Sequence, residues 1–427
     1  MKTVLLLFLV VFSVYTINTP FDYIKNKQDK MYRNLLPSDD VIPNTVLPFL
    51  LLKYGTLNYE VIKDSGLIQC RTNCRYFFLQ TPEGIYSVYP ILTGLMALPF
   101  YLLPMVLNLI PEITSHGNIL RILLLGRTTA GIYATFSVVL FYLMLQKVST
   151  NKLRIMIFTL FYAFGTCTWS ISSRGLWQHT TSQFLNSIAL YLLFLSVEKP
   201  KLIPWVAFTL GWAVAARPTN LIFAIIATIY VFFNYRKYFI TFILATLPAI
   251  IFLCAINIIL FGSPFTEGYS ARGYNAFDLT HWSTPFTESL PVFFLSPARS
   301  YLVLSPPLLF SFLTCFKVFF TRKYPTQFSK LLKYLIPIYL VNTLVILKWV
   351  GWDGSNAFGY RMFVDILPIT ALLAFDFLKD ISKREFALLC VLIITSILFQ
   401  INAVTLRKSR CLSSYNWGFY CLLPLKR

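Results

Sequence analysis

Long apolar runs with almost no charge constrain the fold of this chain more than any other feature. The clearest are residues 4–17, 239–261 and 386–404, which are close to the roughly 20 residues that a helix needs to cross a bilayer. Hydrophobic residues make up 57% of the 427, and charged residues 13%, against about 25% in soluble domains. The sequence therefore predicts an all-α, polytopic membrane protein and excludes a soluble globule.

Basic connectors predict how the chain is threaded through the membrane. After the first third, the apolar segments are 155–173, 184–197, 202–216, 219–234, 239–261, 298–320, 334–350, 362–378 and 386–405. Every second connector is rich in Lys and Arg, and short basic connectors stay cytoplasmic. The connectors expected to face outward are 174–183, 217–219, 262–297, 350–361 and the tail from 406. Because the net charge of +20 is spread over loops and forms no single stripe, nucleic acid is not an expected partner.

The N-terminal segment 1–17 has one early Lys before its apolar run, so it could be a signal peptide or an uncleaved anchor. No pair of small residues follows the run to offer a cleavage site. We therefore prefer the anchor with Lys2 inside. Residues 18–87 then form a large first extracytoplasmic loop.

The basic loop at Lys147 stays inside only if one of the two apolar segments before it does not cross. Segment 88–110 is the better candidate for a broken, re-entrant or interfacial element, because it contains three prolines. Residues 118–146 would then form one long helix. The result is a single membrane domain over residues 1–427, with the N-terminus inside and the tail 406–427 outside. It has about 11 crossings, within a range of roughly 10 to 13.

Cysteine placement agrees with this orientation. The cysteines outside the apolar segments all fall in regions assigned outward: Cys70, Cys74, Cys411 and Cys421. These four allow three pairings, of which the two local ones are the simplest. A zinc site is less favoured, because no His accompanies them.

The first outer loop contains an acidic pair, Asp39 and Asp40, just before a short apolar helix predicted at 44–54 and ended by Gly55. This helix is too short to cross, so we expect it in the membrane interface with the carboxylates just above the lipid. The simpler explanation of the acids is that they cap the helix. Neighbouring residues do not share a helix face, so at most one of the pair would do chemistry.

Residues 81–84, Thr-Pro-Glu-Gly, favour a tight turn between two aromatic runs, 76–79 and 85–89. The pattern predicts a small β-hairpin above the membrane. We expect it to act as a cover without chemistry of its own.

The remaining outer connectors are unusually rich in Arg and aromatic residues. Their notable members are Arg174, Trp177 and His179; Arg217; Glu267, Tyr269 and Arg272; and Trp352, Asp353 and Arg361. A single Arg at a membrane surface is ordinarily an anchor. Four outward loops that each present Arg, against the tendency of basic residues to stay inside, indicate an anion site. The guanidinium fork suits phosphate in particular.

On these residues the chain resembles the GT-C glycosyltransferases, membrane enzymes that use polyprenyl-phosphate-linked sugars. The resemblance rests on Asp39-Asp40, Ser87-Val88-Tyr89-Pro90, Leu176-Trp177-Gln178-His179, and Trp352-Asp353-Gly354 running on to Phe358-Gly359-Tyr360-Arg361. The pattern is similar to bacterial members near the protein O-mannosyltransferases and aminoarabinose transferases. It departs from many relatives at Tyr360, where they have Pro.

The resemblance implies an inverting transfer from the lipid-linked donor to a lipid, glycan or protein acceptor at the outer face of a bacterial plasma membrane. Asp39 or Asp40 would be the base that deprotonates the acceptor hydroxyl. The expected substrate-binding residues are Arg361, Arg272, Arg217, Arg174 and His179 for the phosphate, Trp177 or Trp352 for the sugar face, and Tyr89, Glu267, Tyr269 and Asp353 around them. In related enzymes a monophosphate donor needs no metal, whereas a pyrophosphate donor usually brings a divalent cation.

Other classes of membrane protein remain open at this point. A transporter or flippase would bury ionisable residues within its spans, and Asp365 and Asp376 are the main candidates. A polymerase or ligase of lipid-linked glycans would share the outward Arg residues without needing Asp39 or Asp40. A purely structural membrane protein would need neither the acidic pair nor the outward Arg residues.

Overall fold

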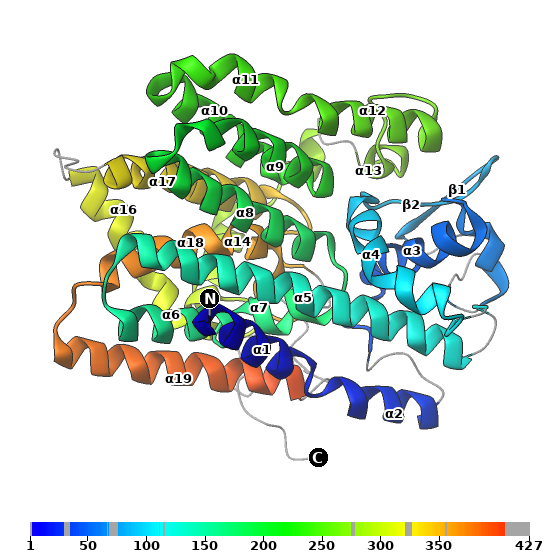
Figure 1. Cartoon of the computed structure of the whole chain (residues 1–427), viewed down its shortest axis with the longest axis horizontal. Helices are drawn as coiled ribbons and strands as arrows, with labels where there is room; N and C mark the ends of the chain where they lie inside the picture. Colours follow the sequence, from blue (N-terminus) through cyan, green and yellow to red (C-terminus); the bar gives the residue numbers. More distant parts are fainter. Residues whose placement is uncertain are drawn as a thin grey trace.

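The computed structural model describes residues 2–29, 35–65, 67, 76–110, 112–113, 116–274, 278–320, 327–354 and 357–405. These residues are mostly helical, as predicted, with one two-stranded sheet (Figure 1). The tail 406–427 and the cysteines at 70, 74, 411 and 421 lie outside the described residues, so the expectations for them stay predictions.

The regular elements follow the apolar segments closely. The first half contains α1 (Lys2–Thr16), α2 (Thr19–Asp29), η1 (Asp39–Val41), α3 (Ile42–Tyr54), η2 (Tyr59–Ser65), β1 (Phe78–Thr81), β2 (Gly84–Ser87), α4 (Leu92–Val106), α5 (His116–Val148), α6 (Lys152–Phe164), α7 (Cys167–Ser170), η3 (Ser172–Arg174), α8 (Gln178–Glu198), η4 (Pro200–Leu202) and α9 (Ile203–Ala216). The second half contains η5 (Pro218–Asn220), α10 (Leu221–Asn234), η6 (Arg236–Tyr238), α11 (Phe239–Leu244), α12 (Leu247–Phe261), α13 (Gly268–Ala271), η7 (Leu279–Trp282), α14 (Phe286–Leu295), α15 (Tyr301–Leu304), η8 (Pro306–Leu309), α16 (Phe310–Phe320), α17 (Gln327–Lys348), η9 (Arg361–Ile366), α18 (Leu367–Leu378) and α19 (Lys383–Thr405).

Within the described residues, five helical stretches are long and apolar enough to cross a membrane. They are His116–Val148, Gln178–Glu198, Arg236–Phe261, Lys330–Lys348 and Lys383–Thr405. The third is only 11% buried, which fits a helix whose sides face lipid. Helix α5 confirms the single long helix expected at 118–146. Shorter apolar helices accompany these five, and α4 is one of them.

Two hydrophobic cores meet along α5. The larger core unites the membrane helices, whereas the smaller one holds α3, α4, the hairpin and the first half of α5. Helix α4 has Pro99 and Pro104 inside it, packs on α3 and exposes Leu102 and Leu103. This placement beside the smaller core agrees with the expectation that 88–110 is not an ordinary span.

Helix α3 begins and ends near the predicted residues, and Gly55 ends it in the left-handed conformation at φ 65°. Its apolar character has a different origin from the one expected. Residues 42–50 are all buried within the protein, so the smaller core accounts for this apolar surface without contact with lipid. The predicted hairpin is confirmed: β1 and β2 pair antiparallel with Thr81 opposite Gly84.

Several segments expected as single helices are interrupted, and three of these segments lead into the site. The segment 155–173 ends as a helix at Phe164, because Gly165 follows and Thr166 then caps the short α7. The segment 298–320 is broken before Pro306, and 362–378 begins as the 3₁₀ turn η9. These breaks lie next to the residues expected to bind substrate.

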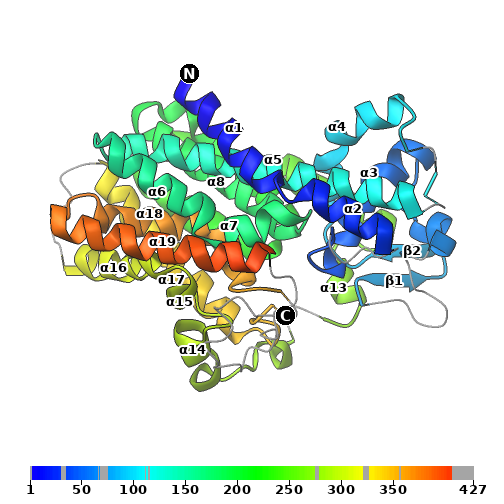
Figure 2. The ribbon, with the colours of Figure 1, turned by 90° about the horizontal axis from the view of Figure 1, so that it is seen from below.

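The connectors expected on the cytoplasmic side lie together at one end of the helices, on the left in Figure 1. Lys147 pairs with Glu198 at 2.9 Å, and Arg154 donates to the carbonyl of Ile381 at 2.6 Å. Helix α13, in the first part of the 262–297 connector, lies away from that end, beside β1 and β2 (Figure 2). The orientation of these connectors relative to a membrane stays a prediction.

Candidate active site

The structure brings one of the two loop aspartates into contact with the last of the predicted arginines. Ser38 caps η1 by accepting a hydrogen bond from the Asp40 backbone N–H at 3.4 Å, and this turn holds the carboxylate at the start of α3. Arg361 begins η9, and its Nη1 donates to Asp40 Oδ2 at 2.7 Å. Both side chains are mostly buried, at 12% and 11% exposure, so water screens the pair only in part.

Two aromatic side chains hold this pair in place. The Arg361 guanidinium lies over the Trp177 ring, 4.6 Å from its centroid, which is a cation–π contact. The Tyr76 hydroxyl donates to Asp40 Oδ1. Burial, and next to it the carboxylate of Asp40, raise the pKa of Tyr76, and Asp39 adds to the shift. Tyr76 therefore stays a neutral donor to the acidic pair.

A second ion pair lies behind the first and is fully buried. Arg217, which follows α9, pairs with Asp365 of η9 and donates to the Met362 carbonyl at 3.2 Å. His179 Nδ1 lies 3.4 Å from the other oxygen of Asp365. The outward Arg217 and the intramembrane candidate Asp365 thus compensate each other, as buried charges must.

Tyr269 and Tyr89 close the site from the side of the 262–274 connector. Gln178 Nε2 donates to the Tyr269 hydroxyl at 2.6 Å, and the rings of Tyr269 and Tyr89 lie 5.7 Å apart. Burial raises the pKa of Tyr269 to about 12. Burial also raises the pKa of Tyr89, with a contribution from Asp40. These phenols are neutral hydrogen-bonding groups at physiological pH.

Two of the residues expected to bind substrate hold the connector instead. Glu267 accepts from the backbone N–H groups of Tyr269 and Ser270 at 3.1 and 3.0 Å, so its carboxylate caps α13. Arg272 donates to the carbonyl of Phe78 and ties the connector to β1. Both residues lie at the site, but these contacts give them a structural role.

Arg174 belongs to a different cluster from the one expected. Its guanidinium lies 3.7 Å from Asp22 of α2, and the same carboxylate pairs with Arg127 of α5 at 2.7 Å. The acidic partner is far away in sequence, on a helix that the apolar pattern did not reveal. The structure therefore places Arg174 in an ion cluster that joins α2, α5 and η3.

The two indoles expected to stack on a sugar are buried. Trp177 is 2% exposed and is covered by Arg361, and Trp352 is 5% exposed. Neither offers an open face in this structure. Trp177 supports a guanidinium instead, and Trp352 packs in the larger core.

Arg299 was not predicted as a site residue and lies directly beneath the Arg361 loop. It is 1% exposed and donates to the carbonyls of Ala357 and Gly359. An Arg at the start of an apolar segment is the only sequence signal that could have revealed it. For Tyr76, the sequence offers no indication of a site role except its position just before the predicted hairpin.

The departure at Tyr360 also has a structural explanation. The Tyr360 hydroxyl shares a hydrogen bond with Ser305 at 2.7 Å and accepts one from the backbone N–H of Cys167 at 3.3 Å. A proline could make neither bond. Tyr360 thereby fixes the backbone just before Arg361 to two other elements.

Gly359 allows the tight turn that presents Arg361, and its replacement by alanine should be costly. Its φ is +63°, and a Cβ would lie 2.9 Å from Cys167 Sγ. Gly359→Ala is expected to destabilise the chain by about 2–3 kcal/mol, of which the backbone conformation accounts for about 1. Gly262→Ala is the matched control, because its φ is +74° and nothing lies within 4 Å of the added atom. Thermal unfolding in detergent measures the stability of both variants. Equal losses would show that the close contact of the added Cβ with Cys167 has no cost.

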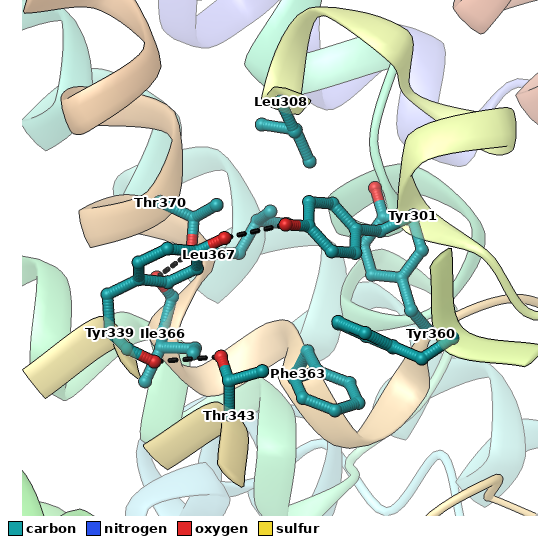
Figure 3. A pocket seen from close by; sticks show the side chains of 10 residues that line it. Tyr301, Leu308, Tyr339, Thr343, Tyr360, Phe363, Ile366, Leu367 and Thr370 are labelled. Carbon is teal, nitrogen blue, oxygen red and sulfur yellow. Dashed lines mark hydrogen bonds between the residues drawn. The ribbon is translucent and has the colours of Figure 1, made fainter. Parts of the chain in front are cut away.

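A small apolar cavity lies on the other side of η9. Tyr301, Tyr339, Tyr360 and Phe363 line it, and the hydroxyls of Tyr301 and Tyr339 bond to each other at 2.6 Å (Figure 3). No charged side chain lines this cavity. The polar chemistry is therefore confined to the Asp40 side of Arg361.

Comparisons with known protein families, with curated proteins and with solved structures found no match. The part of the chain that the structure describes contains no group of three His, Cys, Asp or Glu side chains suited to a metal ion. The groups that the fold brings together at the site are the Asp40 carboxylate, the Arg361 guanidinium in contact with it, and neutral phenols around both.

Proposed function

We propose that this chain is a GT-C-like glycosyltransferase that moves a sugar from a polyprenyl-phosphate donor to a hydroxyl of a lipid, glycan or protein acceptor. The observation that carries the proposal is the contact of Asp40 with Arg361, which brings together a base and a phosphate ligand separated by 321 positions. We further propose about 11 crossings, with the site on the extracytoplasmic side of a bacterial plasma membrane.

In the proposed reaction Arg361 binds the donor phosphate, because a guanidinium makes paired, charge-assisted bonds to phosphate oxygens. The phosphate competes with Asp40 for Arg361, and the released carboxylate accepts the proton of the acceptor hydroxyl. The acceptor oxygen forms the new bond to the anomeric carbon as the bond to the phosphate oxygen breaks. The phosphate leaves with its negative charge on Arg361, and the anomeric carbon is inverted.

The buried residues have supporting parts in this scheme. Arg217 adds positive potential behind Arg361 but remains paired with Asp365. Trp177 holds the Arg361 guanidinium in place.

A transporter or flippase is less well supported than an enzyme. Its two candidate acids are both neutralised near helix ends: Asp365 pairs with Arg217, and Asp376 pairs with Lys379 at 2.7 Å. Neither is left as an uncompensated charge within a span, where such a group would mark a transport path.

The proposed orientation makes a direct prediction. Glu83, at the hairpin tip, and Lys383, at the start of α19, are both exposed and lie at opposite ends of the chain's helices. In intact cells, a membrane-impermeant maleimide is expected to label Glu83→Cys above the background of the unmodified chain. Lys383→Cys should react only after the cells are permeabilised. The reverse pattern would place the site in the cytoplasm.

The enzymatic proposal is tested with the full chain reconstituted in nanodiscs and a panel of polyprenyl-monophosphate sugars. Release of free polyprenyl phosphate, dependent on an acceptor with a hydroxyl group, is the expected result. Asp64→Asn, an exposed acid of the same outer loop, should leave the rate unchanged. Movement of intact lipid-linked sugar across a vesicle without cleavage would overturn the proposal and favour a flippase.

A further inference from the structure

Six side chains form a partly exposed surface beside the site, which we call the aromatic patch. Its members are Tyr274, Leu279, His281, Trp282, Trp349 and Val350. The ring centroids of His281 and Trp349 lie 5.8 Å apart, and those of Trp282 and Trp349 lie 5.1 Å apart. Val350 N–H donates to the His281 carbonyl at 2.9 Å, so the connectors before α14 and after α17 are joined here.

The aromatic patch exposes more apolar surface than is usual for a loop surrounded by water. Leu279 is 81% exposed, Val350 48% and Tyr274 45%. The half-buried indoles of Trp282 and Trp349 lie among them. Contiguous exposed apolar groups of this kind mark a surface that is covered in use.

The position of Trp349 indicates what covers the patch. It directly follows the candidate span Lys330–Lys348, so it stands where that helix would leave the hydrocarbon. The open side of α17 presents Leu340, Val341 and Leu344 at 37–47% exposure, and Val350 continues this lipid-facing side. The patch is thus continuous with a surface that lipid tails cover.

The chemistry of the patch fits the boundary between hydrocarbon and headgroups. Trp and Tyr are enriched at this depth because their rings are apolar and their N–H and O–H groups are not. Lys348 lies next to Trp349, with its ammonium over the Phe286 ring at 5.0 Å, and a Lys at the end of a span commonly extends its charge toward the headgroups.

We propose that the aromatic patch docks into the headgroup region of the outer leaflet and holds the connectors 262–284 and 349–361 on the bilayer. These two connectors carry Tyr269 and Arg361. The membrane is therefore a structural partner of the site, whatever ligand the site takes, and the inference does not depend on sugar transfer.

The test uses tryptophan emission of the full chain in nanodiscs. The contributions of Trp282 and Trp349 are obtained as the difference between the wild type and Trp282→Phe or Trp349→Phe. Lipids brominated near the headgroup should remove most of each contribution, and lipids brominated near the chain ends should remove less. Aqueous iodide should have little effect.

Two variants calibrate the measurement. Trp352→Phe reports an indole three positions away that is buried in the protein, and Trp205→Phe reports one that is 58% exposed on the shorter apolar helix α9. None of the quenchers should reduce the emission assigned to Trp352. Brominated lipid should reduce the emission assigned to Trp205. If iodide quenches Trp282 and Trp349 and brominated lipid does not, the patch faces water and the proposal is wrong. It is equally wrong if neither quencher acts, because protein then covers the indoles.

Discussion

Asp40→Asn is expected to lower the rate of sugar transfer by about 100- to 10,000-fold, the usual contribution of a general base. Asparagine keeps the size of the side chain, but its single oxygen can accept from only one of Tyr76 and Arg361, which contact different oxygens of Asp40. It cannot accept the proton of the acceptor hydroxyl. The loss should therefore appear in kcat, and it should not come from weaker binding of the donor, because the charge that competes with the phosphate for Arg361 is gone.

Two comparisons make this result specific. Asp39→Asn should have a smaller effect, because it is Asp40 that contacts Arg361. Asp64→Asn, exposed in the same loop, should have none. A steady-state assay of phosphate-lipid release, with the Tm of each variant as a check on folding, measures the difference. Full activity of Asp40→Asn would remove the proposed base.

Asp365→Asn is expected to produce the largest loss of stability, about 3–5 kcal/mol, which is typical when one partner of a buried ion pair is removed. The Arg217 guanidinium would be left in the protein interior without its counter-charge, since both side chains are 5% exposed or less. Unfolding in detergent by heat or denaturant measures the effect. Replacing both residues, as Asp365→Asn with Arg217→Gln, should restore part of the loss.

Asp376→Asn is the matched control for this measurement. Asp376 follows Asp365 on the next helix and also pairs with a cation, but the side chain of Lys379 is 24% exposed. Water can replace the lost partner there, so the expected cost is about 1 kcal/mol or less. Equal losses for the two variants would show that the Arg217–Asp365 pair contributes no more than a surface pair.

Features that depend on neighbouring residues could be predicted from the sequence. The long spans, the stop of α3 at Gly55 and the turn at 81–84 each follow from a local pattern of apolar, Gly or Pro residues. The grouping of basic connectors at one end follows from the bias of Lys and Arg along the chain.

The partners of the charged residues could not be predicted, because tertiary packing alone decides them. Nothing local indicates that Arg361 contacts Asp40, whereas Arg174 contacts Asp22. In the sequence, Arg299 is one basic residue at the start of an apolar segment. Tyr76 is one aromatic residue just before the predicted hairpin. The burial of Trp177 and Trp352 could not be predicted for the same reason, since burial is a property of the whole fold.

Helix α5 has a mechanical consequence for the site. Its 33 residues run without interruption through both cores, and a helix of that length extends about 50 Å. A movement of the hairpin and α3 away from the spans would require breaking backbone hydrogen bonds in the middle of α5. The uninterrupted helix α5 therefore ties the smaller core, which packs around α3, to the larger core, which packs around η9.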